Sequence, residues 1–390
     1  MRRVRLKEIG TFYSGLSGKS KSDFSEGNAL LVTYRNIFNN PVLNPAIKDT
    51  VVVGKDEKQN EVLWGDILIT GSSETPADAG MSSVVLFNPQ EKMYLNSFCF
   101  GFRLNDMNEA LPSYIGHLLR STPIRAAISK TAFGVTRFNV NRMRFADIEI
   151  PLPPLNIQKE IVSILDSFTS LIDKMKQEVE MRKKQMEHYR EKLMAPQKNW
   201  KIKTLGEIGT FTRGNGLQKS DFRVKGFPCV HYGQIHTYYN TCIYKTKSFC
   251  EEDLAKKLQK ASYGDLLIAT TSEDVKACCK AAVWFGAGDV AYSGDSFCYS
   301  HDQDPKYMAY LFQTEMFAKQ KQKAATGAKV IRVSGESMAS FSFAFPPLVQ
   351  QRQIASILDT FETYISKLEK MIELRQKQYE YYREKLLTFE

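Results

Sequence analysis

Two parts of the sequence hold residue types that could support chemistry, and neither has a complete pattern. The segment 15–20 (GLSGKS) resembles a phosphate-binding loop, but that motif requires a glycine five positions before Gly18, where Tyr13 stands. Four residues of zinc-ligand type lie close together, with a spacing that fits no usual zinc site: Cys229, His231, His236 and Cys242. We therefore expect no bound nucleotide, no metal and no catalytic residues in this chain.

The remaining candidates lie in loops and are of the types that contact nucleic acids. Arg, Asn, Gln and hydroxyl side chains match base edges, whereas Lys and Arg match phosphates. Four loops in the first part of the chain offer Tyr13, Ser14, Lys19 and Lys21; Tyr34, Arg35 and Asn36; Ser72, Ser73 and Glu74; and Thr136, Arg137 and Asn139. Four matching loops in the second part offer Arg213, Asn215 and Lys219; His231, Tyr232, Gln234 and His236; Thr271, Ser272 and Glu273; and Lys329 and Arg332.

The elements that must position these loops occur twice in the sequence. Six short segments recur in the same order at offsets of 193 to 199 residues. Gly65–Ile69, for example, recurs at 264–268, and Tyr189–Leu193 recurs unchanged at 382–386. Chance matching of common residues would not preserve both the order and the offset, so we infer an internal duplication. The two sets of loops then have the same scaffold but different side chains, as a protein that recognises two unlike half-sites would need.

Each copy is predicted to have a globular part and a helical part. Residues 1–153 and 196–346 contain short β-like runs broken by Gly, Asn and Pro, with one helical stretch each, near 111–129 and 307–323. Residues 154–195 and 347–390 contain no Gly, and their only prolines stand at the start. The predicted fold is therefore α+β, with two similar globular domains separated by two long helices and related by an approximate two-fold axis.

Both long helices have apolar residues in heptad spacing over more than four heptads. The first helix runs into the second globular domain and the second helix leaves it, so we expect an antiparallel coiled coil of roughly 50 Å. Packing of each helix on its own domain is the alternative. The predicted helix-pair seam consists of Ile161, Leu165, Phe168, Ile172, Met175 and Val179 in the first helix, and Ile354, Leu358, Phe361, Ile365, Leu368 and Ile372 in the second.

Charge and composition favour an anionic partner for the globular parts. The 390 residues have a formal net charge of +10. Residues 1–153 have 18 basic and 15 acidic side chains and residues 196–346 have 20 and 14, whereas the helical parts are nearly neutral. Seven cysteines without a CxxC pair, and the lack of a long apolar run or signal core, indicate a reduced, cytoplasmic protein with no membrane span.

Several repeated motifs together carry a family resemblance. They are Pro151–Leu155 with Gln158, Ile161, Leu165 and Asp166, its copy Phe345–Leu348 with Gln351, Ile354, Leu358 and Asp359, the segments Gly65–Leu68 and Gly264–Leu267, and the Glu-Ile-Gly segments at 8–10 and 207–209. With these motifs, essentially the whole chain resembles the specificity (S) subunit of type I restriction–modification systems.

The resemblance implies a non-catalytic subunit with two target-recognition domains, 1–153 and 196–346, and two conserved helical regions, 154–195 and 347–390. Such a chain would recognise a bipartite double-stranded DNA site and dock two methyltransferase (M) subunits, with restriction (R) subunits joining the full complex. It would bind no cofactor itself, because S-adenosylmethionine would belong to the M subunit and ATP and Mg to the R subunit. The alternatives are a self-contained DNA-modifying enzyme with fused reader domains, for which the sequence lacks a cofactor loop, and a coiled-coil scaffold without a DNA role.

Overall fold

The computed structural model describes residues 2–24 and 26–389, so Met1, Ser25 and Glu390 lie outside it. The chain forms two compact units, which are described separately. Unit 1 comprises residues 1–176 and 370–390, and unit 2 comprises residues 177–369. Each compact unit takes in part of both long helices, so the boundaries between the units fall inside these helices. Within the described residues, no helix is long and apolar enough for a membrane span.

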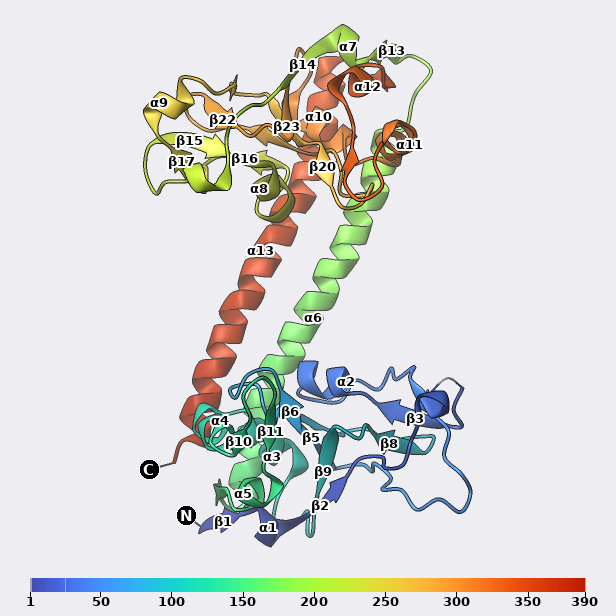
Figure 1. Ribbon diagram of the computed structural model, residues 1–390, viewed down its shortest axis with the longest axis vertical. Helices are drawn as coiled ribbons and strands as arrows, with labels where there is room; N and C mark the ends of the chain where they lie inside the picture. The colour runs from blue at the N-terminus through green and yellow to red at the C-terminus, as the bar shows by residue number, and fades with distance from the viewer. Residues whose placement is uncertain (1, 25, 390) are drawn as a thin grey trace. The chain divides into compact units, whose positions relative to one another are not determined.

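Unit 1 combines short strands and helices (Figure 1). Its elements are β1 (Arg2–Arg5), α1 (Leu6–Ile9), β2 (Gly10–Ser14), η1 (Lys21–Phe24), β3 (Ala29–Val32), α2 (Tyr34–Asn39), β4 (Thr50–Val51), β5 (Ile67–Thr70), β6 (Ser72–Ser73), β7 (Ser82–Val84), β8 (Met93–Leu95), β9 (Cys99–Leu104), α3 (Pro112–Leu119), α4 (Thr122–Ser129), β10 (Ala132–Phe133), β11 (Phe138–Val140), α5 (Arg142–Ala146), β12 (Glu149–Leu152) and the first part of α6 (Leu155–Leu193).

Unit 2 repeats this order with small additions. Its elements are β13 (Lys201–Thr204), α7 (Leu205–Ile208), β14 (Gly209–Arg213), η2 (Lys219–Asp221), β15 (Phe227–Val230), α8 (Tyr232–Thr237), β16 (Cys242–Ile243), β17 (Ser248–Cys250), α9 (Glu252–Ala255), β18 (Lys260–Ala261), β19 (Leu266–Ala269), β20 (Thr271–Ser272), β21 (Lys280–Trp284), β22 (Val290–Tyr292), β23 (Ser296–His301), α10 (Pro305–Leu311), α11 (Glu315–Ala324), β24 (Ile331–Arg332), α12 (Gly335–Ala339), β25 (Ser342–Phe345) and the first part of α13 (Leu348–Leu387). The predicted α+β class and the duplication are confirmed.

The sheets of the two units correspond one to one. The main sheet has the strand order β2-β9-β5-β7 in unit 1 and β14-β23-β19-β21-β16 in unit 2. A second sheet, β4-β3-β8 or β17-β15-β22-β18, contains one parallel pair in each unit, β3 with β8 and β15 with β22. Each helical stretch predicted after the main sheet is confirmed as helical, but it is two helices, because Ser121 and Thr314 stand as N-caps at the break.

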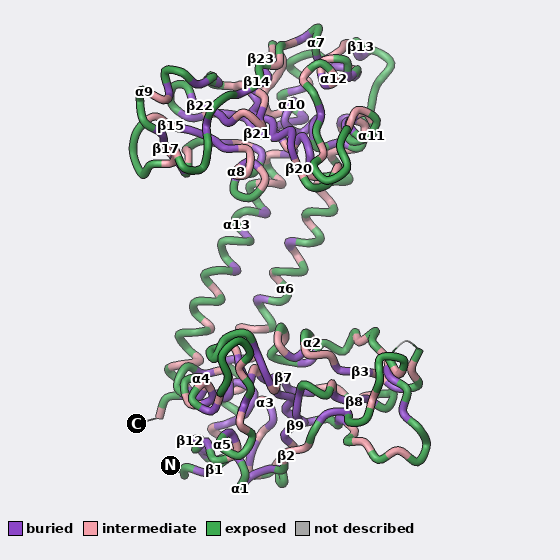
Figure 2. Tube along the Cα trace, viewed as in Figure 1, coloured by how far each residue is buried: buried purple, intermediate pink, exposed green. Residues whose placement is uncertain are grey.

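The main sheet is buried on both faces, which is why β5 begins with the apolar run Ile67–Ile69 and β19 is apolar throughout, Leu266–Ala269 (Figure 2). On one face, Ile67 and Ile69 of β5 pack with α3 and with Leu165 of α6. On the other face, Leu68 joins a separate cluster with Val32 and Ile37, which connects the second sheet to α2. Unit 2 has the same two clusters around Leu266, Ile268 and Leu267 of β19.

The repeated Gly-Asp motif makes the turn that begins the central strand. Gly65 and Gly264 have φ angles of +85° and +93°, a left-handed conformation that favours glycine. The following aspartate closes the turn: Asp66 accepts a hydrogen bond from the Leu63 amide at 2.8 Å, and Asp265 accepts one from the Ser262 amide at 2.8 Å. This motif therefore has a structural role.

Within each unit, segments of the two long helices pack side by side. In unit 2, Lys183 pairs with Glu369 at 2.9 Å, and further along α6 the Tyr189 ring stacks on Phe361, which comes earlier in α13, so the segments are antiparallel. In unit 1, Phe168 of α6 stacks on Tyr382 of α13. All twelve predicted seam residues are buried or half-buried; Leu165 and Leu358 are fully buried.

Hydrogen bonds from polar side chains of the long helices attach the globular part of each unit to these helices. The fully buried Gln158 accepts from the Leu111 amide and donates to the Glu109 and Pro153 carbonyls, all at 2.9 Å. Its counterpart Gln351 accepts from the Asp304 amide and donates to the Pro346 carbonyl and to Gln303. The aspartates of the same motif act similarly, since Asp166 contacts His117 and Asp359 accepts from Tyr310.

The C-terminal ends of the two long helices form matching hydrogen bonds to the globular parts. Glu384 of α13 accepts from the Thr122 amide at the start of α4, and Glu191 of α6 accepts from the Glu315 amide at the start of α11. A carboxylate at a helix N-terminus satisfies free amides and interacts favourably with the helix dipole. Each globular part is thus attached to the beginning of one long helix and the end of the other.

We expect Gln158→Ala to lower the free energy of unfolding by roughly 1.5–4.5 kcal/mol, because three buried hydrogen bonds of about 0.5–1.5 kcal/mol each are lost. Gln351→Ala should have an effect of the same size in unit 2. Urea denaturation measures both. The exposed Gln197 serves as the control, and Gln197→Ala should change stability little. Equal stability of all three variants would contradict the role assigned to the hydrogen bonds of Gln158 and Gln351.

Candidate nucleic-acid interface

Three of the four predicted loops of unit 1 meet at one pocket. Its volume is about 490 Å³, and it is lined by Tyr34 and Phe38 of α2, by Ser72, Ser73, Glu74, Thr75 and Asp78 in and after β6, and by Thr136 and Arg137 before β11. These residues come together because β11 pairs with β6, with Asn139 opposite Ser72. We call α2, β6 and β11 with their adjoining loops the unit 1 face. Figure 1 shows it on the side of the unit from which α6 leaves.

Arg137 is held in a defined position on this face. Its Nε donates to the Ser72 hydroxyl at 3.0 Å, and its guanidinium lies 5.2 Å from the centre of the Phe98 ring. The turn before it requires Gly134, which has φ +130° and whose added Cβ would lie 2.1 Å from the Arg137 carbonyl. A planar guanidinium stacked on an aromatic ring loses little side-chain entropy on binding. The Arg137 guanidinium is therefore pre-organised to donate two hydrogen bonds to one ligand group. Thr136 and Asn139 beside it are exposed.

Unit 2 places its corresponding loops in the same way, and we call α8, β20 and β24 with their adjoining loops the unit 2 face. Thr271 of β20 pairs with Arg332 of β24, and the Thr271 carbonyl is 3.0 Å from Nε2 of His236 on α8. The hairpin that ends at Arg332 also turns on a glycine, Gly327, with φ +101°. Lys329 at the tip and Arg332 are exposed, whereas Thr271 and Ser272 are buried or half-buried, as Ser72 and Ser73 are in unit 1.

A cation from the neighbouring helix, half-buried in unit 1 and buried in unit 2, holds the segment after β6 and after β20. In unit 1, Arg125 of α4 donates to the carbonyls of Ala77, Ala79 and Gly80 at 2.6–2.7 Å. In unit 2, Lys321 of α11 donates to the carbonyls of Lys276 and Cys278 at 2.8–2.9 Å. Burial lowers the pKa of both cations, and the carbonyl dipoles stabilise their charged forms. The third loop therefore has a rigid support in each unit.

In the first loops, three of the predicted contact residues form hydrogen bonds or ion pairs within their own unit. Tyr13 lies in β2 and donates to the buried Asp66, and desolvation with the Asp66 charge raises the pKa of its hydroxyl far above the usual range. Lys19 pairs with Glu57. Asn215 donates to the Lys257 carbonyl at 2.9 Å and accepts from the Gln259 amide at 2.8 Å. These three side chains hold their own loops, while four remain exposed: Ser14, Lys21, Arg213 and Lys219.

Several second-loop residues are also engaged inside their unit. Asn36 donates to the Asn44 carbonyl and accepts from the Asn44 amide, both at 3.1 Å. Gln234 donates to Ser248 at 2.6 Å, and its carbonyl accepts from the His231 amide. His231 caps α8 by accepting from the Gly233 amide, and burial with the nearby Lys219 charge lowers its pKa, which favours the neutral ring that can accept.

The other second-loop residues differ in how far their side chains are exposed to solvent. Arg35 is exposed on α2, and Tyr34 stacks on Phe38 with ring centres 5.7 Å apart. Tyr232 and His236 are half-buried on α8. His236 contacts a backbone carbonyl and His231 caps a helix, so two of the four residues of zinc-ligand type have other partners. Among residues 2–24 and 26–389, no group of three His, Cys, Asp or Glu side chains is arranged to hold a metal ion.

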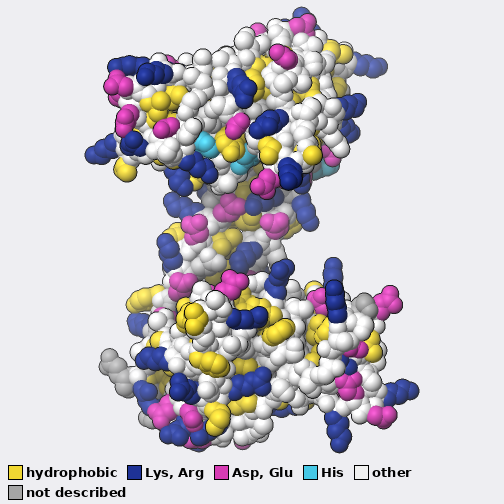
Figure 3. Space-filling model, in the orientation of Figure 1, with side chains coloured by type: hydrophobic (Ala, Val, Ile, Leu, Met, Phe, Trp, Pro, Cys, Tyr) yellow, Lys and Arg dark blue, Asp and Glu magenta, His cyan; other side chains and the backbone are white. Residues whose placement is uncertain are grey.

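Three residues important to these faces were not identified from the sequence. Phe98 supports Arg137 from the turn before β9, and nothing in its local sequence distinguishes it from a core aromatic residue. Arg125 and Lys321 perform the same task but occupy different positions in the repeat, since Lys321 aligns with Ile128. A comparison of the two copies therefore could not have paired them. Figure 3 shows Lys and Arg scattered among acidic side chains on each unit, without a continuous basic patch in that view.

Known proteins with this organisation share one family description. A family model described as the type I restriction modification DNA specificity domain matches residues 1–181 and again 197–376. A Haemophilus influenzae protein described as a type I restriction enzyme specificity subunit is 30% identical over 272 residues, covering 66% of this chain and 68% of that protein. The specificity subunit of an Escherichia coli type I restriction enzyme is 26% identical over 299 residues, covering 73% and 72%.

Solved structures show the same fold. The crystal structure of a type I restriction–modification S subunit from M. genitalium matches 100% of this chain and 96% of its own, with a TM-score of 0.57 and 15% identity. A structure from work on complex assembly and conformational transition of a type I restriction–modification system matches 99% and 97%, with a TM-score of 0.59 and 14% identity.

We expect Asn215→Ala to lower the free energy of unfolding by about 1–3 kcal/mol, because both hydrogen bonds that anchor the first loop of unit 2 are lost. Lys219→Ala, which alters an exposed side chain of the same loop, should change it by less than about 0.5 kcal/mol. Urea denaturation distinguishes the two. If Asn215→Ala weakened nucleic-acid binding with no loss of stability, Asn215 would be a contact residue instead.

Proposed function

This chain belongs to the family of type I restriction–modification DNA specificity subunits, and from that premise we propose that the unit 1 face and the unit 2 face each contact one half of a bipartite DNA site. It is a DNA-recognition subunit and not an enzyme, since catalysis in this family is performed by the M and R subunits. Its two copies of the specificity domain fit two half-site readers.

One observation carries the assignment of the faces. Both units place a helix, a short strand and a glycine-based hairpin together, yet the side chains at matched positions differ. Asn139 of β11 corresponds to Arg332 of β24, and Thr136 corresponds to Lys329. A common backbone with unlike donors and acceptors is what recognition of two different sequences requires. A two-stranded ribbon is also narrow enough to enter the major groove.

The side-chain types on each face support two roles, contact with bases and contact with phosphates. Arg137 and Arg332 have the donor geometry for guanine O6 and N7, and Asn139 can hydrogen-bond to adenine N6 and N7. Exposed cations around them suit phosphates, which set the register without sequence information: Lys21 and Arg35 in unit 1, and Arg213, Lys219 and Lys329 in unit 2. The engaged residues Tyr13, Lys19, Asn36, Asn215, Gln234 and His231 are assigned to loop support.

Subunits of this family act with M and R subunits on DNA, and we place two M subunits on the long helices. Matched apolar side chains are exposed on the helical segments of each unit: Ile164, Leu171 and Leu374 in unit 1, and Ile357, Tyr364 and Met181 in unit 2. In unit 2, Ile357 and Tyr364 line a groove of about 550 Å³ with Arg182. Two equivalent apolar surfaces support two copies of one partner. S-adenosylmethionine would then belong to the M subunit, and ATP and Mg to the R subunit.

We expect Arg137→Ala and Arg332→Ala each to relax one position in one half of the methylated motif, because one specific base contact contributes about 1–3 kcal/mol of discrimination. The measurement is sequencing of methylated positions in DNA from cells that make the M and S subunits. The two variants should alter different halves.

Lys256→Ala provides the control, since Lys256 is exposed directly after α9 and its amine pairs with Asp253. The motif should be unchanged in this variant. If Arg137→Ala relaxed both halves, or reduced methylation at every site without changing the motif, the unit 1 face would not be a half-site reader.

A further inference from the structure

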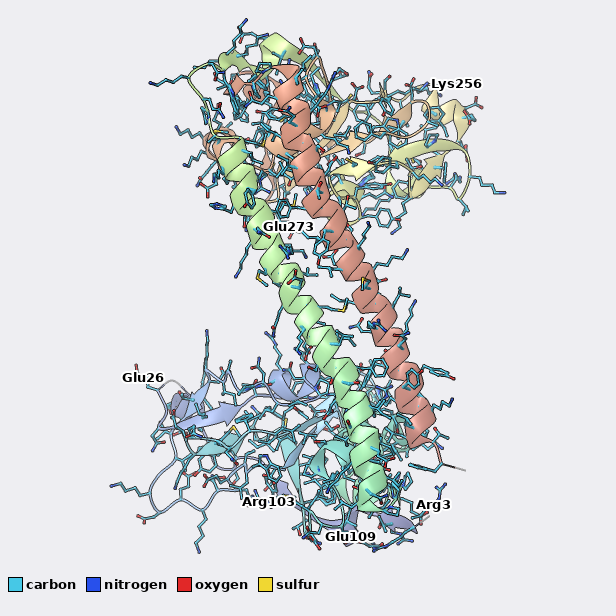
Figure 4. All side chains as sticks on the ribbon, turned by 180° about the vertical axis from the view of Figure 1, so that it is seen from behind. Arg3, Glu26, Arg103, Glu109, Lys256 and Glu273 are labelled. Atoms are coloured by element: carbon cyan, nitrogen blue, oxygen red, sulfur yellow. The ribbon has the colours of Figure 1, made fainter. Side chains whose placement is uncertain are left out.

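One acidic residue occupies the same place on both faces. Glu74 directly follows β6 and Glu273 directly follows β20, at the repeat offset of 199 residues. Figure 4 labels Glu273 and Lys256 in separate parts of unit 2. Neighbouring positions that suit base contact differ between the copies, as Asn139 and Arg332 do. A residue kept on two otherwise different faces has a task common to both half-sites.

These carboxylates have no structural task in the folded units. Both side chains are exposed, and across the residues that the structure describes, neither has an ion pair or a side-chain hydrogen bond. The turns that follow are capped by their neighbours: Thr75 accepts from the Asp78 amide, and Asp274 accepts from the Ala277 amide. Replacing either glutamate by alanine therefore removes no side-chain hydrogen bond or ion pair within the unit.

A carboxylate on a DNA-binding face works against affinity. Phosphates attract cations and repel anions, and this sequence-independent term dominates non-specific binding. The favourable DNA partners for a carboxylate are hydrogen-bond donors on base edges, which in the major groove are cytosine N4 and adenine N6. An exposed glutamate at this position thus raises the difference between a correct and an incorrect base while lowering the affinity for all other DNA.

We propose that Glu74 and Glu273 are specificity-determining residues, each accepting a hydrogen bond from the exocyclic amino group of a base in its own half-site. The inference rests on the proposed function. It adds a hydrogen-bond acceptor on each face to the arginine donors already assigned there. Glu74 lines the same pocket as Arg137, so a guanidinium that donates and a carboxylate that accepts lie on one face. In unit 2, Arg332 pairs with Thr271, two residues before Glu273. Such a pair matches the acceptors and donors of neighbouring bases.

The test uses the complex of M subunits with Glu74→Ala, Glu273→Ala or wild-type S subunit, because alanine has no side-chain acceptor. Methylated-motif sequencing should show one relaxed position, in the first half for one variant and in the second half for the other. Discrimination at that position should fall about 5–150-fold, the range for a single base contact. Binding of each variant to DNA without the site should tighten, because one negative charge is lost from the altered face.

Base analogues identify the donor directly. Duplexes carrying the motif are made with 2-pyrimidinone in place of single cytosines or purine in place of single adenines, so that one amino group is missing. Wild-type complex should lose affinity for one such duplex per half, and the matching alanine variant should lose no further affinity on it, as in a double-mutant cycle. Which analogue shows the effect tells cytosine from adenine. Additive losses for every duplex would overturn the proposal.

Controls separate this inference from the proposed function. Glu252→Ala at an exposed position of α9 should leave the motif unchanged. If both alanine variants at Glu74 and Glu273 keep the wild-type motif while Arg137→Ala relaxes the first half, the glutamate assignment alone is wrong. If the arginine and glutamate variants all keep the wild-type motif, the face assignment itself is wrong. A uniform loss of methylation with unchanged DNA binding would instead assign the glutamates to a protein partner, and it would also overturn the inference.

Discussion

The buried amide of Gln158, with its counterpart Gln351, determines where each long helix is attached to its globular part. A glutamine without solvent access must satisfy its donors and acceptor within the protein, and the observed orientation of the helix start places three backbone groups around Gln158. Asp166 and Glu384 extend this attachment along both helical segments of unit 1. This attachment also fixes the unit 1 face relative to the helical segments of unit 1, because the same core connects α3, the main sheet and Leu165.

A fixed backbone frees the exposed side chains to vary. Arg125 and Lys321 bind the carbonyls after β6 and β20 from inside each unit, so the third loop does not depend on the residues that it presents outward. The hairpins before β11 and β24 turn on Gly134 and Gly327 in the same way. If the two faces contact DNA as proposed, sequence changes at positions such as Asn139 and Arg332 would alter recognition without altering the fold, and one scaffold could serve two unlike half-sites.

Features that repeat along the chain could be predicted, and features that depend on distant packing could not. The heptads, the duplication and the helical stretches follow local periodicity, and the residues predicted for the seam are buried or half-buried. Tyr13, Asn36 and Asn215 have the composition of loop contacts, but composition does not reveal that Asp66, Asn44 and Lys257 lie within hydrogen-bond distance. Phe98 could not be assigned to Arg137 either, because the two residues meet only after β9 and the hairpin have packed.

The central claim is that each unit recognises its own half-site through an equivalent face, and an exchange of globular parts tests it most directly. In a chain with residues 196–346 in place of residues 1–153, both units would carry the face with Arg332, Lys329 and Glu273. Sequencing of the DNA methylated by its complex with M subunits should then show a motif whose two halves contain the same bases, both equal to the half that unit 2 recognises. A motif that keeps its original first half, or one in which both halves change, would contradict the account.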